Sequence, residues 1–502
     1  MKKNDKSFLG TIFPSPQQNQ NQNEQTGNSA HRNVENWCER QQKNKPQSNS
    51  VGAGIMIMLV SGLHIGWSIG SPNLRLQVWF VNVPDGEILL ALCSWFGGAI
   101  IGSFIALFIL PMWEKKTIYY VGVIVSVISN APLIGFPNES IVIILCRILA
   151  GISHGFIYIT TIIHASENAI KEIRGLILGS IHFCIITSVF TTSILMAVGQ
   201  EADGENFEPN MVIGIIGTVY SLMALPMIPF LTYESVVFLI ERQRYSEAIR
   251  NMIKLRNESV ETWEIKNDFD EMKLMVCEDV RSSKSIFADG NLRPLLLMIL
   301  VKFLFVLSFN YGLNMIKFLS VDEILMGHWS SAWLFGIRLL AALVAIFFFD
   351  TFGRRIILAV SAGGKAISLL VYGFLNLGVQ GSYVAVIASE IFLGLGLGSV
   401  SDILFSEAFS SRKKVLSMIV VTVIENALQI ALILSLVNLS TRSYEDAFVF
   451  TTGGLMIVIT IFLYLQLPET RFMSLRQTRD EFRLMGNATY SRQQPPQGIT
   501  SA

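Results

Sequence analysis

Twelve apolar runs dominate this sequence, each near the ~20 residues that a helix needs to cross the hydrocarbon core of a bilayer. In a bilayer, backbone polar groups must be bonded within the chain, so runs of this length predict transmembrane helices. The composition agrees, because 51% of the 502 residues are hydrophobic and only 15% are charged. We therefore expect an all-α membrane protein with spans at about 51–70, 87–111, 117–135, 140–163, 175–199, 211–231, 294–319, 327–349, 356–378, 383–407, 415–438 and 447–466.

Polar segments divide these runs into six and six. The first residues include the Gln/Asn-rich tract "SPQQNQNQNEQ" and no signal-peptide core, so we expect a disordered arm there. The long polar interruption contains "ERQRYSEAIRNMIKLR", which has the composition of a helix. The predicted organisation is an arm at 1–50, a six-helix bundle at 51–231, a helical linker at 232–293, a second bundle at 294–466 and a tail at 467–502.

Lysine and arginine predict the orientation. They gather in loops of one parity, as at Lys115–Lys116 and Arg412–Lys414, while the opposite loops hold few of them. By the positive-inside rule, both termini and the linker are then cytoplasmic in a multi-pass protein, which we expect in the plasma membrane. Asn138 and Asn438 become candidate extracellular glycosylation sites, although each lies close to a helix end.

A comparison at a fixed period indicates that the two halves are a parallel repeat. Glu167 precedes Arg174 by seven residues, and Glu407 precedes Lys414 by the same distance, 240 residues later. The pair Glu234 and Glu469, after the sixth and twelfth spans, recurs at a shift of 235. Repeats of this kind surround a cavity near the middle of the bilayer and rock about it.

The stretch "FFFDTFGRR" places an acid and two arginines at the end of an apolar run. Charges at the inner ends of neighbouring helices can pair when the inner mouth is closed and must part when it opens. Arg354 and Arg355 are alternatively simple membrane anchors. Because equivalent charges recur in both halves, we favour a latch that includes Asp350.

Six motifs in this order resemble those of the major facilitator superfamily, specifically its sugar porter family. They are "CSWFGGAIIG", "RILAGISHG", "ENAIKEIRG", "YESVVFLIERQRYSEAIRNMIKLR", "DTFGRR" and "LPETRFMSL". The chain is similar to insect-type facilitated glucose and trehalose carriers over residues 51–485. The resemblance implies alternating-access facilitated diffusion of a hexose or trehalose, without a cofactor. It also implies a cytoplasmic salt-bridge network of Arg147, Glu167, Arg174, Glu234, Asp350, Arg354, Arg355, Glu407, Lys414 and Glu469.

The loop after the second span departs from the family pattern. The family has an acid and a glycine there, where this chain has Pro111 and Glu114. Lys115 and Lys116 keep the charge of the gate but lose the planar guanidinium that grips carboxylates with two hydrogen bonds. We therefore expect the amino-terminal part of the latch to be weaker than the carboxy-terminal part.

The predicted substrate pocket departs further. The family's amide-rich seventh span is "KFLFVLSFNY" here, and its fifth-span glutamine is His182. Asp402 and Glu425–Asn426 stand at the family's tryptophan and Asn-Trp positions in the tenth and eleventh spans. The candidate substrate-binding residues are His182, Lys302, Ser308, Asn310, Tyr311, Asn314, Asp402, Glu425 and Asn426.

Five ionisable side chains fall well inside the spans of the second half: Lys302, Arg338, Glu390, Asp402 and Glu425. A charge at the bilayer centre costs about 2.5–3.5 kcal/mol on insertion scales, so these groups should face a cavity or one another. In one interpretation, a base among them pairs with Asp402 or Glu425 and only holds helices together. In the other, some of them contact the solute, which would then be charged or zwitterionic.

His64, in "GLHIG", lies where proton-coupled members of the family carry an acid. An imidazole titrates near pH 6.5, so proton symport is an alternative mechanism. A lone histidine in an apolar helix is more often a hydrogen-bonded packing residue, and facilitated diffusion stays the preferred mechanism.

The sequence offers no enzyme signature. We find no phosphate-binding loop, metal-ligand spacing or nucleophile–base set, and "GLGLG" at 394–398 lies inside the tenth span, where glycine serves close helix packing. The expected partners are a small solute and the lipid bilayer, without nucleic acid or an obligate protein partner. The competing class is a receptor or sensor that keeps the fold and has lost transport.

Overall fold

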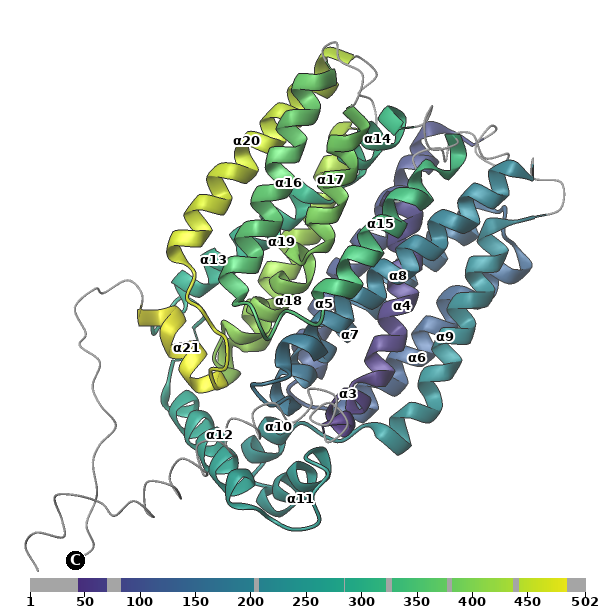
Figure 1. Cartoon of the computed structure of the whole chain (residues 1–502). Coiled ribbons are helices and arrows are strands. Elements are labelled where there is room, and N and C mark those ends of the chain that lie inside the picture. The colour runs from purple at the N-terminus through teal and green to yellow at the C-terminus, as the bar shows by residue number, and fades with distance from the viewer. Residues whose placement is uncertain are drawn as a thin grey trace, which may run out of the picture.

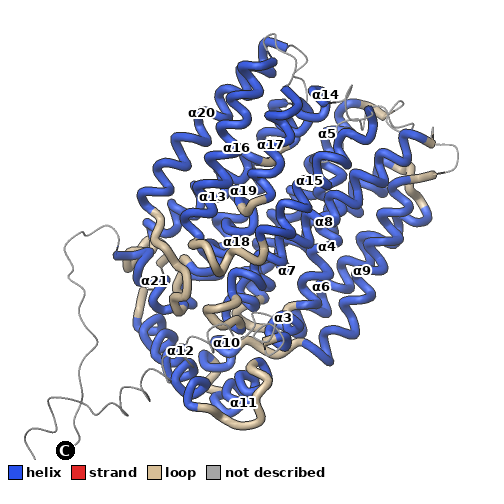
Figure 2. The backbone as a smooth tube through the Cα atoms, in the orientation of Figure 1, coloured by secondary structure: helices blue, strands red, loops and turns tan. Residues whose placement is uncertain are grey.

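The computed structural model describes residues 44–69, 83–202, 207–283, 285–321, 327–376, 382–436 and 442–484. These residues form helices and loops without a strand (Figure 2). Twelve stretches of helix among them are long and apolar enough to cross a membrane, which confirms the predicted all-α membrane fold. Asn438, Cys38 and nearly all of the predicted amino-terminal arm lie outside the described residues.

The first half contains six long helices. They are α4 (Gly52–Ile69), α5 (Asp85–Ile109), α6 (Lys115–Gly135), α7 (Ser140–Asn168), α8 (Arg174–Glu201) and α9 (Pro209–Leu231).

Glycine sets the closest crossing of the first half, between α5 and α7. A side chain at Gly98 would collide with the backbone of Ile148, and one at Gly151 with the backbone of Trp95. Small residues at such a crossing let two backbones approach closely within a membrane. This crossing holds α7 against α5 and so fixes the position of the side chains that α7 presents to the second half.

The second half also crosses six times, but two of its spans are interrupted. Its helices are α13 (Leu292–Ser308), α14 (Tyr311–Val321), α15 (Ser330–Ala345), α16 (Arg354–Asn376), α17 (Ser382–Gly394), α18 (Leu397–Glu407), α19 (Ser411–Leu436) and α20 (Arg442–Gln466). The short 3₁₀ turn η3 (Gly327–Trp329) precedes α15. The eighth span, predicted to reach residue 349, is helical only to Ala345 and continues as turns.

The sequence analysis did not predict the two interruptions. In the seventh span, the side-chain amide of Asn310 donates to the carbonyls of Val306 and Leu307, and its oxygen accepts from the amide of Leu313. These bonds satisfy backbone groups that a continuous helix would have paired. In the tenth span, Gly396 has φ 143°, a conformation that residues with a side chain rarely adopt, so this glycine interrupts the span as well as packing closely.

Further helices lie at one end of the bundle, which we call the linker end; the opposite end is the far end (Figure 1). They are α3 (Lys45–Ser50), α10 (Val236–Glu241), α11 (Tyr245–Leu255), α12 (Trp263–Arg281) and α21 (Leu475–Leu484). Helices α10 to α12 share a small apolar core of their own, with Leu239, Met252 and Phe269 among its members. The linker is therefore a folded unit between the two halves.

Candidate functional site

A cavity of about 70 Å³ lies between the two halves. The first half contributes to it from α4, α5, α7 and α8, and the second half from α13, α18, α19 and the break after α13. Pockets for drug-sized ligands are usually about 300–1,000 Å³, so this cavity is closed down and must widen to admit a solute. The lining residues are Ile65, Ile69, Trp95, Phe96, His154, Tyr158, His182, Ile185, Ile186, Lys302, Phe305, Phe309, Asp402, Thr422, Glu425, Asn426 and Gln429.

A charged cluster lies at the centre of this lining. Lys302 Nζ is 2.8 Å from Asp402 Oδ1 and 3.4 Å from Glu425 Oε2. The Tyr158 hydroxyl donates to Asp402 Oδ1 at 2.5 Å and accepts from Lys302 Nζ at 2.8 Å. Since Tyr158 belongs to α7 and the three charged residues to α13, α18 and α19, the cluster joins the two halves across the cavity.

Two histidines and several aromatic rings surround the cluster. His182 Nδ1 is 3.9 Å from Asp402 Oδ2, and its ring meets Phe305 edge-on. The ring of His154 lies between Trp95 and Tyr158, with centroids 4.7 and 5.2 Å away. The cavity thus offers hydrogen-bond donors and acceptors beside apolar ring faces, which suits a compact, polyhydroxylated solute.

Gly398 of α18 gives the His182 ring its space, because any side chain there would overlap the imidazole. This close approach positions a first-half histidine against the second-half carboxylate Asp402. A glycine of the predicted packing motif therefore helps to build the cavity wall.

Five of the nine candidate substrate residues line the cavity: His182, Lys302, Asp402, Glu425 and Asn426. The sequence analysis missed His154, Tyr158 and Gln429. His154 and Tyr158 are four residues apart on α7 and so share one face of that helix. That spacing could have predicted that both side chains face the cavity, but the family motifs do not include it.

The other four candidates have different places. Ser308 donates to the carbonyl of Phe305, and Asn310 stabilises the break in the seventh span. Asn314 Nδ2 donates to the carbonyl of Ile69 at 3.4 Å, which joins α14 to α4 of the first half at the far end. Tyr311 is buried at the start of α14. These four residues are not among those that line the described cavity.

Arg338 does not join the central cluster. Its Nε donates to Glu390 Oε2 at 2.7 Å, and Lys317 and Lys365 both approach the other oxygen of the same carboxylate. Of the two bases considered for pairing with Asp402 or Glu425, Lys302 makes that pair and Arg338 does not. The count of buried charges also overlooked Lys317 and Lys365, single lysines within apolar stretches.

The predicted latch residue Asp350 bridges the halves at the linker end. Its carboxylate oxygens accept from the backbone amides of Gly175 and Leu176, at 3.0 and 2.9 Å, in the first turn of α8. An acid is favourable at a helix amino terminus, where amides are unpaired and the helix dipole is positive. Arg354 Nη2 lies 3.2 Å from the same carboxylate, but desolvation outweighs it and raises the pKa of Asp350.

Two further contacts cross between the halves here. Arg174 Nη1 lies 3.2 Å from Glu407 Oε1, and Lys414 Nζ donates to Ser166 Oγ at 2.9 Å. All four residues are buried. Together with Asp350, these contacts close the linker end of the cavity.

Other predicted gate residues make equivalent contacts within each half. Glu469 accepts from the backbone amides of Arg354 and Arg355, at the start of α16. Glu234 likewise accepts from the amide of Lys115, at the start of α6, at 2.7 Å. Burial raises the pKa of Glu234, although the positive charge of Lys115 opposes the rise. The repeat inferred from spacing is thus visible as a repeated cap.

Glu167 and the side chains of Lys115 and Lys116 make contacts of their own. Glu167 accepts a hydrogen bond from Ser235, and Lys116 is half-buried near the start of α6. The ammonium of Lys115 lies over the ring of Phe238, 4.8 Å from its centroid. These contacts lie within the first half and its linker.

An acid from the linker contacts the helix at which the acid missing at Pro111 would be expected by the repeat. Asp279 of α12 accepts from the backbone amide of Ser411, at the start of α19, at 2.8 Å. Its other oxygen accepts from Arg479 of α21 at 2.7 Å. Helix α19 is the counterpart of α8, so an acid meets the first turn of both helices, although only Asp350 comes from the opposite half.

Arg147 is not part of this network, contrary to the prediction. It donates to the carbonyls of Ala91 and His64, bonds Ser68, and lies 4.2 Å from the ring centroid of Trp67. It precedes Glu167 on α7 by 20 residues, about 30 Å of helix. Arg147 therefore belongs to the packing of the far part of the first half.

His64, the candidate proton site, lies in the same region. It is buried, and its Nε2 lies 3.3 Å from Asn130 Oδ1. It does not line the described cavity.

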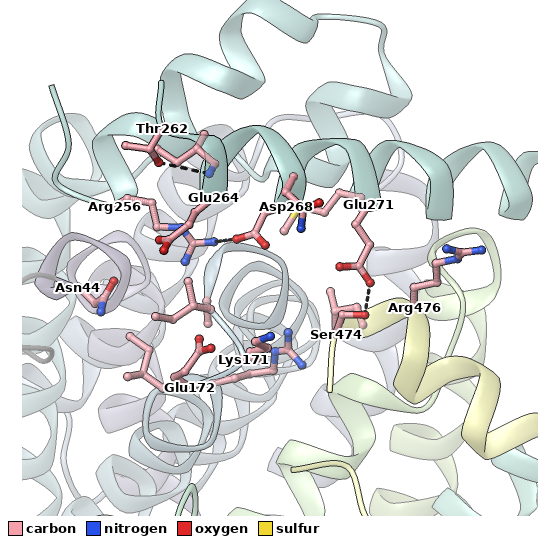
Figure 3. A pocket seen from close by; sticks show the side chains of 18 of the residues that line it. Asn44, Lys171, Glu172, Arg256, Thr262, Glu264, Asp268, Glu271, Ser474 and Arg476 are labelled. Atoms are coloured by element: carbon pink, nitrogen blue, oxygen red, sulfur yellow. Dashed lines mark hydrogen bonds and ion pairs between the residues drawn. The ribbon is translucent and has the colours of Figure 1, made fainter. Parts of the chain in front are cut away.

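A larger cavity, of about 500 Å³, lies at the linker end among α12, the loop between α11 and α12, the loop before α8 and the start of α21 (Figure 3). Arg256 and Asp268 form part of its wall, with Arg256 Nη2 2.8 Å from Asp268 Oδ2. Ser474 donates a hydrogen bond to Glu271. Its lining mixes both signs of charge. It is formed largely by the linker and is separate from the cavity between the halves.

Comparisons with known proteins agree with this architecture. The sequence model of the family described as "Sugar (and other) transporter" matches residues 22–482. The major myo-inositol transporter IolT of Bacillus subtilis (strain 168) is 25% identical over 464 residues, which cover 86% of this chain and 93% of that protein. Sugar transporter ERD6-like 6 of Arabidopsis thaliana is 25% identical over 468 residues, with 88% and 92% covered.

Among solved structures, this fold is similar to that of the major facilitator superfamily proton:xylose symporter XylE bound to 6-bromo-6-deoxy-D-glucose. The TM-score is 0.73 and the sequence identity 15%, over 88% of this chain and all of that one. At this identity, the likeness establishes the fold.

Proposed function

This chain belongs to the sugar (and other) transporter family, and we propose that it moves a sugar or related polyol, a hexose or trehalose in the first instance, by alternating-access facilitated diffusion. The family consists of transporters, so the protein is a carrier and not an enzyme. It is an integral, multi-pass membrane protein, with twelve candidate spans in the part of the chain that the structure describes.

The observation that carries this proposal is a narrow cavity between the halves, with contacts between the halves at both of its ends. At the linker end, Asp350 meets the first turn of α8. At the far end, Asn314 of α14 donates to α4, and Trp329 donates to Glu201 at 3.2 Å. Breaking either set alone would open the cavity to one side, which is what alternating access requires.

The chemistry of the lining supports a polyhydroxylated solute. Each sugar hydroxyl both donates and accepts hydrogen bonds, and Asp402, Glu425, Gln429 and Asn426 supply acceptors while Lys302 supplies a donor. Trp95 and Phe305 offer apolar faces against which the C–H surface of a sugar ring can pack. The curated relatives carry myo-inositol transport and sugar transport in their names, and both are compounds of this class.

The central cluster favours a second candidate function. Lys302 faces two carboxylates, Asp402 and Glu425, so the cluster has one acid more than it has bases. A cationic or zwitterionic solute would supply the missing positive charge, whereas an anion would meet repulsion. Such a solute would compete with Lys302 for the carboxylates.

Orientation and location are part of the proposal. We assign the linker end to the cytoplasm, because Lys115, Lys116, Arg354, Arg355 and Arg412 lie on that side of the spans. Both termini are then cytoplasmic, and we propose the plasma membrane as the site of action.

The test is uptake into proteoliposomes that contain the purified protein. The panel is labelled glucose, trehalose, myo-inositol and xylose, with arginine and glutamate as charged solutes. Saturable uptake of a neutral sugar or polyol that unlabelled solute inhibits is the expected result. Uptake of arginine alone would replace the proposal with the second candidate. Sugar binding without uptake would instead indicate a sensor.

A further inference from the structure

The second half contains a buried cluster of charges apart from the central cavity. Its members are Lys317 on α14, Arg338 on α15, Lys365 on α16 and Glu390 on α17, each no more than 2% exposed. Three bases therefore surround one acid. None of the four residues lines either of the two cavities described above.

Within the cluster, Arg338 and Glu390 form an ion pair, and the two lysines are left without a carboxylate of their own. Arg338 binds one Glu390 oxygen through two of its nitrogens, and its guanidinium lies 4.5 and 4.8 Å from the ring centroids of Phe309 and Phe335. A guanidinium keeps its proton in proteins, so this pair is neutral as a unit. Lys317 and Lys365 share the other oxygen, with Lys365 Nζ 3.2 Å away.

Two protonated lysines would leave the cluster with two uncompensated positive charges in a buried site. Burial and neighbouring like charge both favour the neutral amine, and lysine, unlike arginine, readily gives up its proton. A neutral amine also accepts a hydrogen bond from an ammonium beside it. The electrostatic cost of the packed cluster is therefore lower when one of its two lysines has lost a proton.

The cluster lies on elements that can move. Lys317 belongs to α14, the part of the seventh span beyond the break at Asn310, and Glu390 belongs to α17, the part of the tenth span before Gly396. Helix α14 also carries Asn314, which bonds α4 across the far end. Movement of α14 would thus open the far end and admit water to the lysines in one step.

We propose that Lys317 and Lys365 form a proton-binding site that links the position of α14, and with it the far end of the carrier, to pH. With α14 packed, one amine is neutral; when α14 moves away, water reaches the pair and the amine takes up a proton from it. Acid therefore favours the displaced state, because the displaced state binds one proton more. This inference rests on the proposed function only in regarding the far end as a gate.

Other ionisable groups on neighbouring elements are not members of this cluster. His182 on α8, Lys302 on α13, Asp402 on α18 and Glu425 on α19 face the central cavity. The Tyr372 hydroxyl shares a hydrogen bond with Ser320, which also ties α16 to α14, while Glu445 and Asp446 lie in the first turns of α20. His64 on α4 is bonded to Asn130.

The experiment measures hydrogen–deuterium exchange of the α14 backbone amides in the purified protein in nanodiscs, with labelling times scaled for intrinsic exchange. Between about pH 8.5 and about pH 6, exchange of α14 in the wild type should increase by about tenfold, within the limit for one proton. Lys365→Met, which removes the amine, should reduce this response to less than about twofold, with slow exchange throughout. Lys365→Arg, which stays charged, should exchange fast at both pH values.

Two controls make the result decisive. His64→Gln should respond like the wild type, and Lys317→Met should lose the response as Lys365→Met does, which provides a second variant if one fails to fold. A wild type without a pH response, or a response that survives both methionine variants, would overturn the proposal. Because no solute is present, a failure of solute uptake would be seen separately and would bear on the carrier function alone.

Discussion

Away from the linker end, the cations buried deep within the spans have different partners in the two halves. In the first half, Arg147 is satisfied by backbone carbonyls, Ser68 and the ring of Trp67. In the second half, Lys302 and Arg338 are held by carboxylates from other helices. An ion pair between two helices holds only while those helices keep their relative position. In the second half, a shift of one helix against another would therefore separate paired charges.

The same contrast appears in the helices themselves. Helix α7 is continuous over 29 residues, whereas its counterpart in the second half is divided into α17 and α18. The position equivalent to Gly396, 240 residues earlier, is the buried Phe156 inside α7. Among the described residues, the interrupted spans and the charged clusters beside them thus lie in the second half.

The largest effect is expected from removing the shared acid of the second half. Glu390→Gln leaves three buried bases without a carboxylate, and loss of one partner of a buried ion pair costs about 3–5 kcal/mol. Arg147→Met in the first half leaves polar groups but no unpaired charge, and should cost about 1–3 kcal/mol. Thermal unfolding of both variants in the same detergent measures the difference. Equal losses, or a larger loss for Arg147→Met, would contradict the contrast between the halves.

The next effect concerns the cluster in the cavity. Lys302→Met should weaken solute binding by about ten- to hundredfold, the equivalent of one charged hydrogen bond. The double variant Lys302→Met/Asp402→Asn removes one base and one acid, and so restores the wild-type net charge of the cluster. If the cluster binds solute, the double variant should recover thermal stability but not affinity in equilibrium binding assays. Recovery of both would assign the cluster a purely structural role.

A smaller effect should separate the two acids that meet α8 and α19. Asp350→Asn weakens two backbone-amide contacts across the halves and the pair with Arg354 within the second half. Asp279→Asn weakens one amide contact and the pair with Arg479. With Thr422→Cys as a reporter inside the cavity, labelling from the linker end should increase by about tenfold for Asp350→Asn and about threefold for Asp279→Asn. The reverse order would show that the linker is the stronger closure.

The smallest effect is a pH dependence confined to the linker. The hydrogen bond from Lys413 lowers the pKa of Asp289 below its ordinary value. Such a group contributes stability that is present above its unfolded pKa and is lost as the pH falls through the lower folded pKa. Protection of residues 285–291 from hydrogen exchange should therefore be constant near neutral pH and fall in acid. In Asp289→Asn that acid step should be missing; its persistence would assign it to another group.

The sequence was sufficient for the features that depend on local pattern. The lengths of the apolar runs predicted the twelve spans. The shift of 240 residues paired Glu167 with Glu407 and Arg174 with Lys414 from the sequence alone. Such features need no knowledge of which side chains meet in space.

Features that depend on contacts between distant helices were not predictable in the same way. Arg147 resembles a gate residue in its motif, but its place on α7 puts it about 30 Å from the gate. Asp279 contacts the helix at which the acid missing at Pro111 would be expected by the repeat, from a segment with no motif for that role. Lys317 and Lys365 look like isolated charges until the fold brings them to the same carboxylate.

The most direct test of alternating access is to hold the linker end shut. In a variant without other cysteines, Ser166→Cys and Lys414→Cys would place thiols where Lys414 now reaches across to Ser166. A short reducible crosslinker that joins them should abolish solute uptake, and reduction should restore it. In each single-cysteine variant, adding the crosslinker should leave the rate of uptake unchanged. Uptake that continues at the wild-type rate through a fully crosslinked protein would contradict the account.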